Sequence, residues 1–280
     1  MAISVLTNVA SLNAQRNLNA TQNSLSSSIA RLSSGMRINN ASDDAAGLGI
    51  SENLKADLRS LSQASRNAND GVSMSQVAEG SMNEMQGIVT RMRELSIQSA
   101  NQTLGSTERG YIQTEFGQLR NEINRISNVT EFNGQKLIDG SASAGLTFQV
   151  GIQNTADDRI SMSITRLTAS TLGSTSLHIA SASLSTATNA QASINVFDKA
   201  IEQLSTARAK VGAVQNRMQV TISNLSVAHE NLSAANSRIR DVDVASETAQ
   251  LSKSQILSQA GVAVLAQANQ IPQAALSLLR

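Results

Sequence analysis

The sequence predicts a mainly α-helical protein: an elongated antiparallel bundle or coiled coil of long helices, with paired terminal helices and a small β-hairpin region. Two observations indicate this fold class. A single proline, Pro272, occurs in 280 residues, so almost nothing interrupts a helix. Aromatic residues make up 2% of the chain, whereas a roughly spherical core usually takes much of its buried area from aromatic side chains. The composition therefore favours thin helical packing over a thick core.

Apolar residues recur at a spacing of three and four over two very long tracts. The first runs from Leu54 to Leu95, and the second runs from Ile194 to Val242. Each tract predicts one amphipathic helix of roughly 45–50 residues, on the order of 70 Å long. Helices of this length without an internal proline are typical of a coiled coil or a rod.

A shorter helix and a hairpin are predicted between the two tracts. An apolar stripe predicts a helix from about Thr107 to Asn128, and Asn133-Gly134 and Asp139-Gly140 then mark turns. Polar and apolar residues alternate in Leu146–Val150 and again in Ile160–Ile164. This alternation on both sides of a polar stretch predicts a β-hairpin.

The two ends of the chain are apolar and nearly uncharged. Residues 1–35 contain two charged side chains, and residues 246–280 contain three. Two isolated helices of this kind would leave apolar surface in water, which drives association. We therefore expect the terminal segments to pair with each other and then with neighbouring copies.

Several functions are disfavoured by composition. A net charge of +1, from 22 basic and 21 acidic residues, gives no electrostatic reason to expect a nucleic acid partner. The absence of cysteine removes disulfides, thiol catalysis and zinc–thiolate sites. The N-terminus lacks the pattern of a cleaved secretory signal. Polar residues interrupt the most apolar stretch, residues 260–279, so no membrane insertion is expected.

No pattern of catalytic, cofactor-binding or metal-ligating residues is found. His178 and His229 have no acidic or histidine residues at metal-ligand spacing. Gly47-Leu-Gly49 lacks the third glycine of a dinucleotide fingerprint, and neither a phosphate loop nor a nucleophile elbow occurs. Asp43-Asp44 could bind a cation, but helix-starting chemistry is favoured, with Ser42 as the N-cap. We expect no enzyme activity, no cofactor and no metal.

Several long motifs resemble those of bacterial flagellins. The segment Leu32-Ser-Ser-Gly-Met-Arg-Ile-Asn-Asn-Ala-Ser-Asp-Asp-Ala-Ala-Gly-Leu-Gly-Ile50 is similar to the N-terminal hallmark of that family. Phe132-Asn-Gly-Gln-Lys-Leu-Ile-Asp-Gly140 resembles a second signature. Three runs are similar to the C-terminus of the family: Ile239–Asp243, Gln255–Ala260 and Gln267–Gln273. Motifs this long, in this order, are far more specific than helical spacing alone.

The resemblance also implies a division into domains. Residues 1–42 and 245–280 would form an inner domain of paired terminal helices that line a tube. Residues 43–165 and 190–244 would form an outer domain of long helices with the β-hairpin. Residues 166–189, rich in serine, threonine and alanine, would be a short variable surface segment that is loop or weakly ordered. The chain thus resembles a near-minimal flagellin.

For function, the resemblance implies a structural subunit that polymerises into the extracellular flagellar filament for swimming motility. It implies type III export without cleavage, an export chaperone on the C-terminal segment, and hook-associated junction and cap proteins as partners. Ordering the ends of a lone molecule costs roughly 1–2 kcal/mol per residue, so we expect them to fold on assembly into an open helical homopolymer. The residues expected to pack in the tube are Leu6, Val9, Leu12, Leu25, Ile29, Leu257, Val264, Ile271 and Leu278.

One stretch resembles the family's binding site for the vertebrate Toll-like receptor that recognises flagellin. The match comprises Arg91, Leu95 and Gln98, with Glu115 from the next helix. In that helix Gln118-Leu119-Arg120 departs from the family's Gln-Arg-Leu, so one arginine is displaced. Receptor recognition and simple packing between subunits are both open explanations of these residues.

Two other structural classes share some of these features. A hook–filament junction protein has similar ends, but the long motif from Leu32 to Ile50 favours a filament subunit. A signalling helix bundle, such as a chemoreceptor cytoplasmic region, would need a membrane anchor and an uninterrupted helical hairpin. The β-rich insert predicted here argues against that class.

Overall fold

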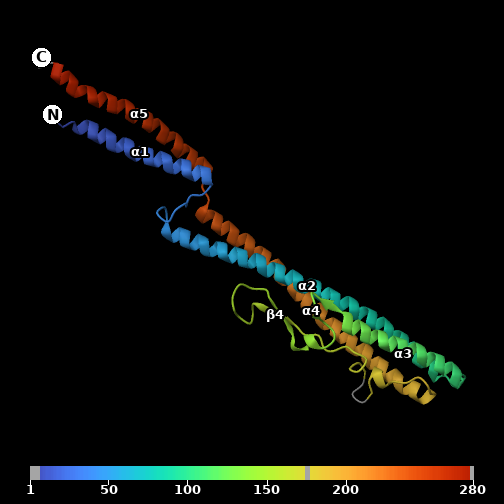
Figure 1. The fold of residues 1–280 in the computed structure, drawn as a ribbon. Helices are drawn as coiled ribbons and strands as arrows, with labels where there is room; N and C mark the ends of the chain where they lie inside the picture. Colours follow the sequence, from blue (N-terminus) through green and yellow to red (C-terminus); the bar gives the residue numbers. More distant parts are fainter. Residues whose placement is uncertain (1–6, 174–176, 278–280) are drawn as a thin grey trace. The chain divides into compact units, whose positions relative to one another are not determined.

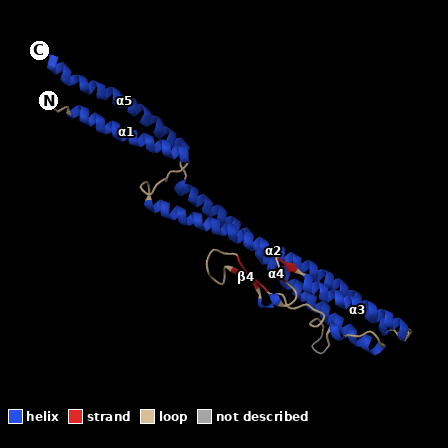
Figure 2. Ribbon diagram, in the orientation of Figure 1, coloured by secondary structure: helices blue, strands red, loops and turns tan. Residues whose placement is uncertain are grey.

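The computed structural model describes residues 7–173 and 177–277, with side chains up to residue 270. Figures 1 and 2 show the helices of the described chain: α1 (Val9–Ser34), α2 (Ala45–Ala100), α3 (Ser106–Val129), α4 (Ala187–Arg240) and α5 (Val244–Ser277). Two short 3-10 helices, η1 (Ser141–Ala144) and η2 (Ile179–Ser181), accompany them. Two compact units are present: unit 1 comprises residues 1–58 and 230–280, and unit 2 comprises residues 59–229. The predicted mainly α-helical fold is confirmed.

The long helices of unit 2 pack through seams that repeat every seven residues. On α2 the seam includes Leu61, Ala64, Ala68, Ser75, Ala78, Met82, Met85, Val89, Met92, Ser96 and Ser99. On α4 it includes Ala190, Ser193, Phe197, Ala200, Leu204, Ala207, Val211 and Met218. Steps of three and four sustained over this length are the pattern of a left-handed coiled coil. Phe116 of α3 meets Phe197 edge to face, with ring centroids 5.9 Å apart, and closes the core.

Two antiparallel hairpins belong to unit 2. Strand β1 (Glu131–Phe132) pairs with β2 (Gln135–Lys136) across Asn133-Gly134, whose positive φ angles of 50° and 77° suit a tight hairpin turn. Strand β3 (Leu146–Gln149) pairs with β4 (Arg159–Met162) in the predicted hairpin. Val150 and Ile160 pack against Ala68 of α2 and Met218 of α4, which holds this hairpin on the helices.

The segments 166–173 and 177–186 lie mostly outside regular secondary structure, but they are not merely surface. Leu172, Ile179 and Leu184 are at most 1% exposed and belong to the core of unit 2. The prediction of a weakly ordered surface is wrong for these positions. Their apolar side chains are isolated in a background of serine and threonine, so they produce no periodic signal.

The start of α2 differs in one residue from the prediction. Asp44 is the N-cap, because its carboxylate accepts a hydrogen bond from the N–H of Gly47 at 2.8 Å. Ser42, the predicted cap, lies in the preceding turn. Both residue types can cap a helix, and sequence alone does not select between neighbours two positions apart.

Candidate assembly surface

Helices α1 and α5 of unit 1 lie side by side and antiparallel (Figure 1). Their facing positions again follow steps of three and four: Ser11, Ala14, Leu18, Thr21, Leu25, Ser28 and Leu32 on α1, and Leu251, Ser254, Ser258, Gly261, Leu265 and Ala268 on α5. Most of these side chains are small. Among the described side chains of the pair, only Ser28, Ser254 and Ala268 are buried. The seam therefore brings the two backbones together without removing much apolar surface from water.

Polar contacts hold the pair near the chain termini. The Oδ1 atom of Asn8 accepts the N–H of Ser11 at 3.0 Å, which starts α1. The Nδ2 atom of Asn8 donates to the carbonyl of Ala268 at 2.8 Å. The hydroxyl of Ser11 donates to the side-chain oxygen of Asn269 at 2.8 Å. These directional bonds fix which residues of α1 and α5 face each other.

A second set of contacts holds the opposite end of the pair. The carbonyl of Gly35 accepts the N–H of Val242 at 3.1 Å, and the N–H of Arg37 donates to the carbonyl of Arg240 at 2.6 Å. The guanidinium of Arg37 also donates to the carbonyl of Ile239 at 2.7 Å. Backbone hydrogen bonds thus join the segment that follows α1 to the segment between α4 and α5. Gly35 has a φ of 72°, the left-handed conformation that commonly ends a helix.

Asp43 stabilises the loop that follows α1. Its carboxylate accepts the N–H of Asn39 at 3.1 Å and the N–H of Asn40 at 3.0 Å. The backbone hydrogen bonds from Asn40 and Asn39 lower the pKa of the Asp43 carboxyl below its ordinary value. The guanidinium of Arg31 lies 3.9 Å from this carboxylate and 3.9 Å from that of Glu247. The Asp43 carboxylate therefore binds backbone groups of its own loop. The described residues contain no group of three or more candidate metal ligands.

Large apolar side chains project from the outside of the α1–α5 pair. Those between 49% and 66% exposed are Val9, Leu12 and Ile29 on α1, and Val244, Ile256, Leu257, Val262 and Val264 on α5. We call these eight residues the outer apolar row. Exposed apolar residues gathered on one helix pair mark an interaction surface.

The predicted tube-packing residues fall into three groups. Val9, Leu12, Ile29, Leu257 and Val264 belong to the outer apolar row. Leu25 lies half-buried in the seam between α1 and α5. Leu6, Leu278 and the side chain of Ile271 lie outside the described residues. Sequence reasoning missed Val244, Ile256 and Val262, because it followed one stripe of α5 while apolar residues occupy several of its faces.

The residues that resemble a receptor site lie on α2 and α3 of unit 2. The guanidinium of Arg91 lies 2.8 Å from the carboxylate of Glu115 and 3.2 Å from that of Glu94. Hydrogen bonds to Glu115 and then Glu94 raise the pKa of Arg91 above its ordinary value. Gln98 is exposed, whereas Leu95 is 1% exposed and lies in the core. Arg91, Glu115 and Gln98 therefore offer surface, and Leu95 supports them from beneath.

The departure from the family pattern in α3 has a structural counterpart. Leu119 is half-buried and packs against the core of unit 2. Arg120 donates to the carbonyl of Ala180 at 3.2 Å, in the 3-10 helix η2 before α4. The displaced arginine, Arg120, is thus held by a hydrogen bond within unit 2.

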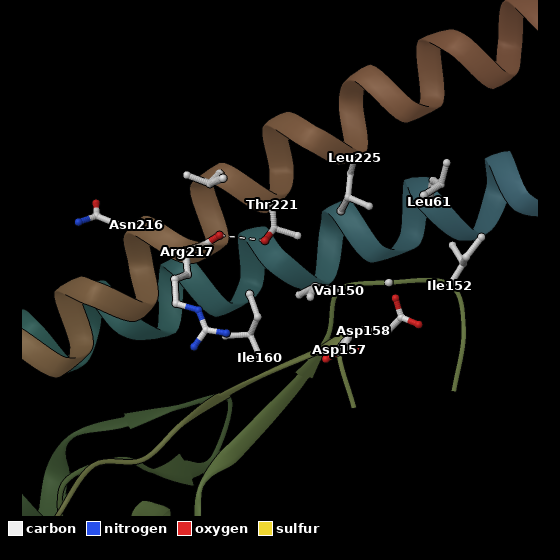
Figure 3. Close-up of a pocket in the computed structure, with 12 residues that line it drawn as sticks. Leu61, Val150, Ile152, Asp157, Asp158, Ile160, Asn216, Arg217, Thr221 and Leu225 are labelled. Atoms are coloured by element: carbon white, nitrogen blue, oxygen red, sulfur yellow. Dashed lines mark hydrogen bonds between the residues drawn. The ribbon is translucent and has the colours of Figure 1, made fainter. Parts of the chain in front are cut away.

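A groove of about 600 Å³ lies between the β3–β4 hairpin and helices α2 and α4 (Figure 3). Its apolar lining includes Leu61, Val150, Ile152, Ile160, Val220 and Leu225. At its rim the hydroxyl of Thr221 donates to the carbonyl of Arg217 at 2.9 Å, within α4. The carboxylate of Asp158 accepts the N–H of Gln153 at 3.1 Å and the hydroxyl of Thr155 at 2.9 Å. The Asp158 carboxylate thereby stabilises the hairpin loop.

Coiled-coil seams and an outer apolar row on the terminal helices define a structural protein that associates with further copies. Comparison with known proteins identifies its family. The family model of the bacterial flagellin N-terminal helical region matches residues 5–143, and that of the C-terminal helical region matches residues 194–279. The chain is 44% identical to a flagellin of Halalkalibacterium halodurans over 273 residues, covering 98% of each chain. The chain belongs to the bacterial flagellin family.

Further relatives agree with this assignment. The chain is 44% identical to a flagellin of Bacillus subtilis over 301 residues, and 42% identical to the flagellar filament 33 kDa core protein of Treponema phagedenis over 283 residues. Each alignment covers 98% of both chains. As a flagellin, the chain is a structural subunit that self-assembles into the extracellular flagellar filament, and it is not an enzyme. Within the part of the chain that the structure describes, no helix is long and apolar enough to cross a bilayer.

Proposed function

We propose that neighbouring copies cover the outer apolar row, and that α1 and α5 become stably ordered as copies join. One observation carries this proposal. The described side chains of the pair bury only Ser28, Ser254 and Ala268, while eight large apolar side chains remain about half exposed or more. The large apolar side chains of this helix pair can therefore be buried mainly by contact with a neighbouring copy.

The energetics favour folding that is coupled to assembly. Fixing the backbone costs roughly 1–2 kcal/mol per residue, and the small seam side chains offset little of that cost. Each large apolar side chain that a neighbour covers completely contributes roughly 1.5–3 kcal/mol. The side chains of the outer apolar row start about half exposed, so each gains part of that amount. Added over the row, this burial stabilises the ordered helices in the polymer more than in the lone chain.

This mode of contact leads to an open filament. Residues 1–42 and 245–280 would act as the inner, polymerising domain, with residues 43–165 and 190–244 outside it and residues 166–189 as the variable segment. Head-to-tail contacts between identical subunits that do not close on themselves generate a helical polymer.

Substitution of the outer apolar row tests the proposal directly. Val264→Asp or Leu257→Asp should abolish polymerisation, because a carboxylate would have to be desolvated between copies. Val227→Asp makes the same substitution at a position of α4 in unit 2 that is 56% exposed, and it should assemble nearly as wild type. Sedimentation and negative-stain microscopy measure assembly, and circular dichroism verifies the long helices of unit 2.

The same proposal is open to refutation by truncation. Chains lacking residues 1–30 or residues 250–280 should remain helical monomers that do not form filaments. Efficient filament growth by both truncated chains, or by Val264→Asp, would contradict the proposal.

The apolar surface of α5 also supports an export chaperone as a partner before assembly. Residues 246–280 contain three charged side chains, so a chaperone that covers them would prevent premature association of chains awaiting type III export. Deletion of residues 250–280 should abolish binding of the purified flagellin-specific export chaperone, whereas deletion of residues 1–30 should leave it intact. Equal binding by both truncated chains would exclude this role of the C-terminal segment.

At the two ends of a filament the outer apolar row would lack a covering copy of the same chain. This supports contacts with the hook-associated junction proteins at one end and with the cap protein at the other, through the same surface. Val264→Asp should then weaken binding of monomers to hook-associated junction proteins in a pull-down assay, while Val227→Asp in unit 2 should not. Undiminished binding by Val264→Asp would argue against a shared surface.

The surface of Arg91, Gln98 and Glu115 supports recognition by the vertebrate Toll-like receptor for flagellin. A guanidinium exposed by 49% and held in place by Glu115 loses little conformational entropy on binding. Arg91→Ala should reduce the response of a receptor reporter assay, with Arg125→Ala as a matched control on the neighbouring helix. If Arg91→Ala instead impairs polymerisation and leaves the receptor response unchanged, this surface packs subunits.

A further inference from the structure

In unit 2, four segments surround the core in a closed order. The hydroxyl of Thr130, directly after α3, donates to that of Ser81 on α2 at 3.0 Å. The side chain of Asn124 on α3 accepts the N–H of Ala169 at 3.0 Å, so the segment 165–173 follows α3. This segment meets α4, because Gln203 and the backbone of Gly173 exchange two hydrogen bonds of 2.9 Å.

Helix α4 then returns to α2 and completes the ring. The guanidinium of Arg208 on α4 donates to the side chain of Gln86 on α2 at 2.8 Å and lies 3.8 Å from the carboxylate of Glu79. The order around unit 2 is therefore α2, α3, the segment 165–173, and α4. In a ring of four, the groove between α2 and α3 lies opposite the groove between the segment 165–173 and α4.

The groove between α2 and α3 is acidic. It measures about 680 Å³ and includes the carboxylates of Glu84, Glu122 and Glu131 with the guanidinium of Arg125. Lys136, which lies outside the groove lining, pairs with Glu131 at 2.5 Å, so these charges together leave one excess negative charge, that of Glu84. Arg125 pairs with Glu122 at 2.6 Å, and Glu84 forms no ion pair with any described residue. Apolar walls formed by Val77, Ile88, Ile126 and Val129 flank these charges.

The opposite groove is basic. It measures about 450 Å³ and includes the cationic groups of Arg166, Lys199 and Lys210 with the carboxylate of Glu202. Three positive charges and one negative charge leave an excess of two positive charges. Lys199 pairs with Glu202 at 2.7 Å. Arg166 attracts the carboxylate of Asp139 electrostatically, without an ion-pair contact. Lys210 forms no ion pair among the described residues.

The two grooves lie at the same level along the helices. Arg208, which lies two residues from Lys210 of the basic groove, contacts Glu79 and Gln86. Those two residues flank Glu84 of the acidic groove in sequence. Two copies that stand side by side in the same orientation can therefore bring the basic groove of one against the acidic groove of the next.

We propose that the basic groove of one subunit docks on the acidic groove of its neighbour in the filament. This contact rests on the self-assembly described above and adds a specific pair of surfaces in unit 2. Because the two grooves differ and lie on opposite sides, the contact is head-to-tail and repeats from copy to copy. Partly exposed ion pairs contribute little affinity, so the charges chiefly select the orientation and register of neighbours, while α1 and α5 supply most of the binding energy.

A charge exchange tests this contact. Lys210→Glu should raise the critical concentration for polymerisation by about tenfold, and so should Glu84→Lys, because each places like charges against each other. The double variant restores opposite charges at every contact and should assemble within about threefold of wild type. Asp70→Lys, a reversal on an exposed position of α2 outside both grooves, is the control and should assemble as wild type. Circular dichroism should show unchanged helix content in all four variants.

The outcomes separate this contact from the role of the terminal helices. Single variants that assemble as wild type, or a double variant no better than the worse single variant, would overturn the docking of the two grooves. Loss of assembly by Val264→Asp would still support the role of the outer apolar row in either case. Conversely, assembly by Val264→Asp would contradict that role, and the charge-exchange variants would still test the docking of the two grooves.

Discussion

Gly261 of α5 lies directly against Leu18 of α1: a Cβ atom added to the glycine would lie 3.2 Å from Cδ1 of the leucine. The leucine side chain thus occupies the space that a side chain on α5 would fill. In a seam of small residues, this contact sets how closely the two terminal helices approach.

Gly261→Leu should therefore separate α1 from α5. Overpacking of a seam costs typically about 1–3 kcal/mol, so filaments should dissociate at a lower temperature, measured by light scattering on heating. Gly261→Ala should be nearly neutral, because higher helix propensity, worth about 1 kcal/mol, offsets slight crowding of Leu18. Ala213→Leu, at an exposed position of α4 in unit 2, is the control for added bulk. Equal effects of both leucine variants would argue against close packing at Gly261.

Acid should loosen the loop after α1. The pKa of the Asp43 carboxyl is lowered in the folded chain, so its stabilisation is complete above its ordinary value of 3.8 and is lost as the pH falls through the lower folded value. Hydrogen exchange of the Asn39 and Asn40 amides should accelerate there relative to its ordinary pH dependence. Asp43→Asn should remove this extra acceleration, whereas Asp70→Asn should preserve it. A wild-type profile in Asp43→Asn would show that another group controls the loop.

The edge-to-face pair of Phe116 and Phe197 should dominate the stability of unit 2. Phe116→Ala removes a side chain that is 0% exposed, and such truncations lower the free energy of unfolding by about 3–5 kcal/mol. Tyr111→Ala, at a position of the same helix that is 73% exposed, should change it by less than about 0.5 kcal/mol. Urea unfolding of the monomer, followed by circular dichroism, measures both. Similar losses in the two variants would contradict the packing described for α3.

Two buried serines of α2 should differ in importance. The hydroxyls of Ser99 and Ser96 donate at 2.6 Å to the carbonyls of Leu184 and Ala190, respectively. Ser99→Ala should cost about 1–3 kcal/mol in urea unfolding, because Leu184 lies in irregular chain and its buried carbonyl loses this donor. Ser96→Ala should cost less, since Ala190 lies within α4 and its carbonyl also accepts a helical hydrogen bond. A larger loss of stability in Ser96→Ala than in Ser99→Ala would show that the segment around Leu184 does not depend on Ser99.

The fold was largely predictable, because its seams repeat over many turns. Two tracts with apolar residues every three or four positions correspond to α2 and α4, and alternation at residues 146–150 corresponds to β3. The predicted helix from Thr107 to Asn128 agrees with α3, Ser106–Val129. Periodicity needs no knowledge of the partner segment, since each helix displays its buried face in its own residues.

Single contacts between distant segments were not predictable. Leu184 packs in the core where Ser99 and Gln113 bind its backbone, and neither residue is near it in sequence. The opposite charges of the two grooves likewise arise from segments far apart in the chain. The outer apolar row was predicted in part, because a helix with apolar residues on several faces does not reveal which face its partner covers.

Because most side chains between α1 and α5 are small, the polar contacts at the two ends of the pair do much to fix how the helices align. Sliding one helix along the other would exchange one serine, alanine or threonine for another at little energetic difference, so in the middle of the pair it is the leucines, such as Leu18 against Gly261, that oppose a shift. Asn8 and Ser11 at one end, and Arg37 at the other, accept one alignment. A residue inserted into the middle of α1 would therefore break at least one of these sets of contacts, because the rotated helix could not match Gly261 and both ends at once.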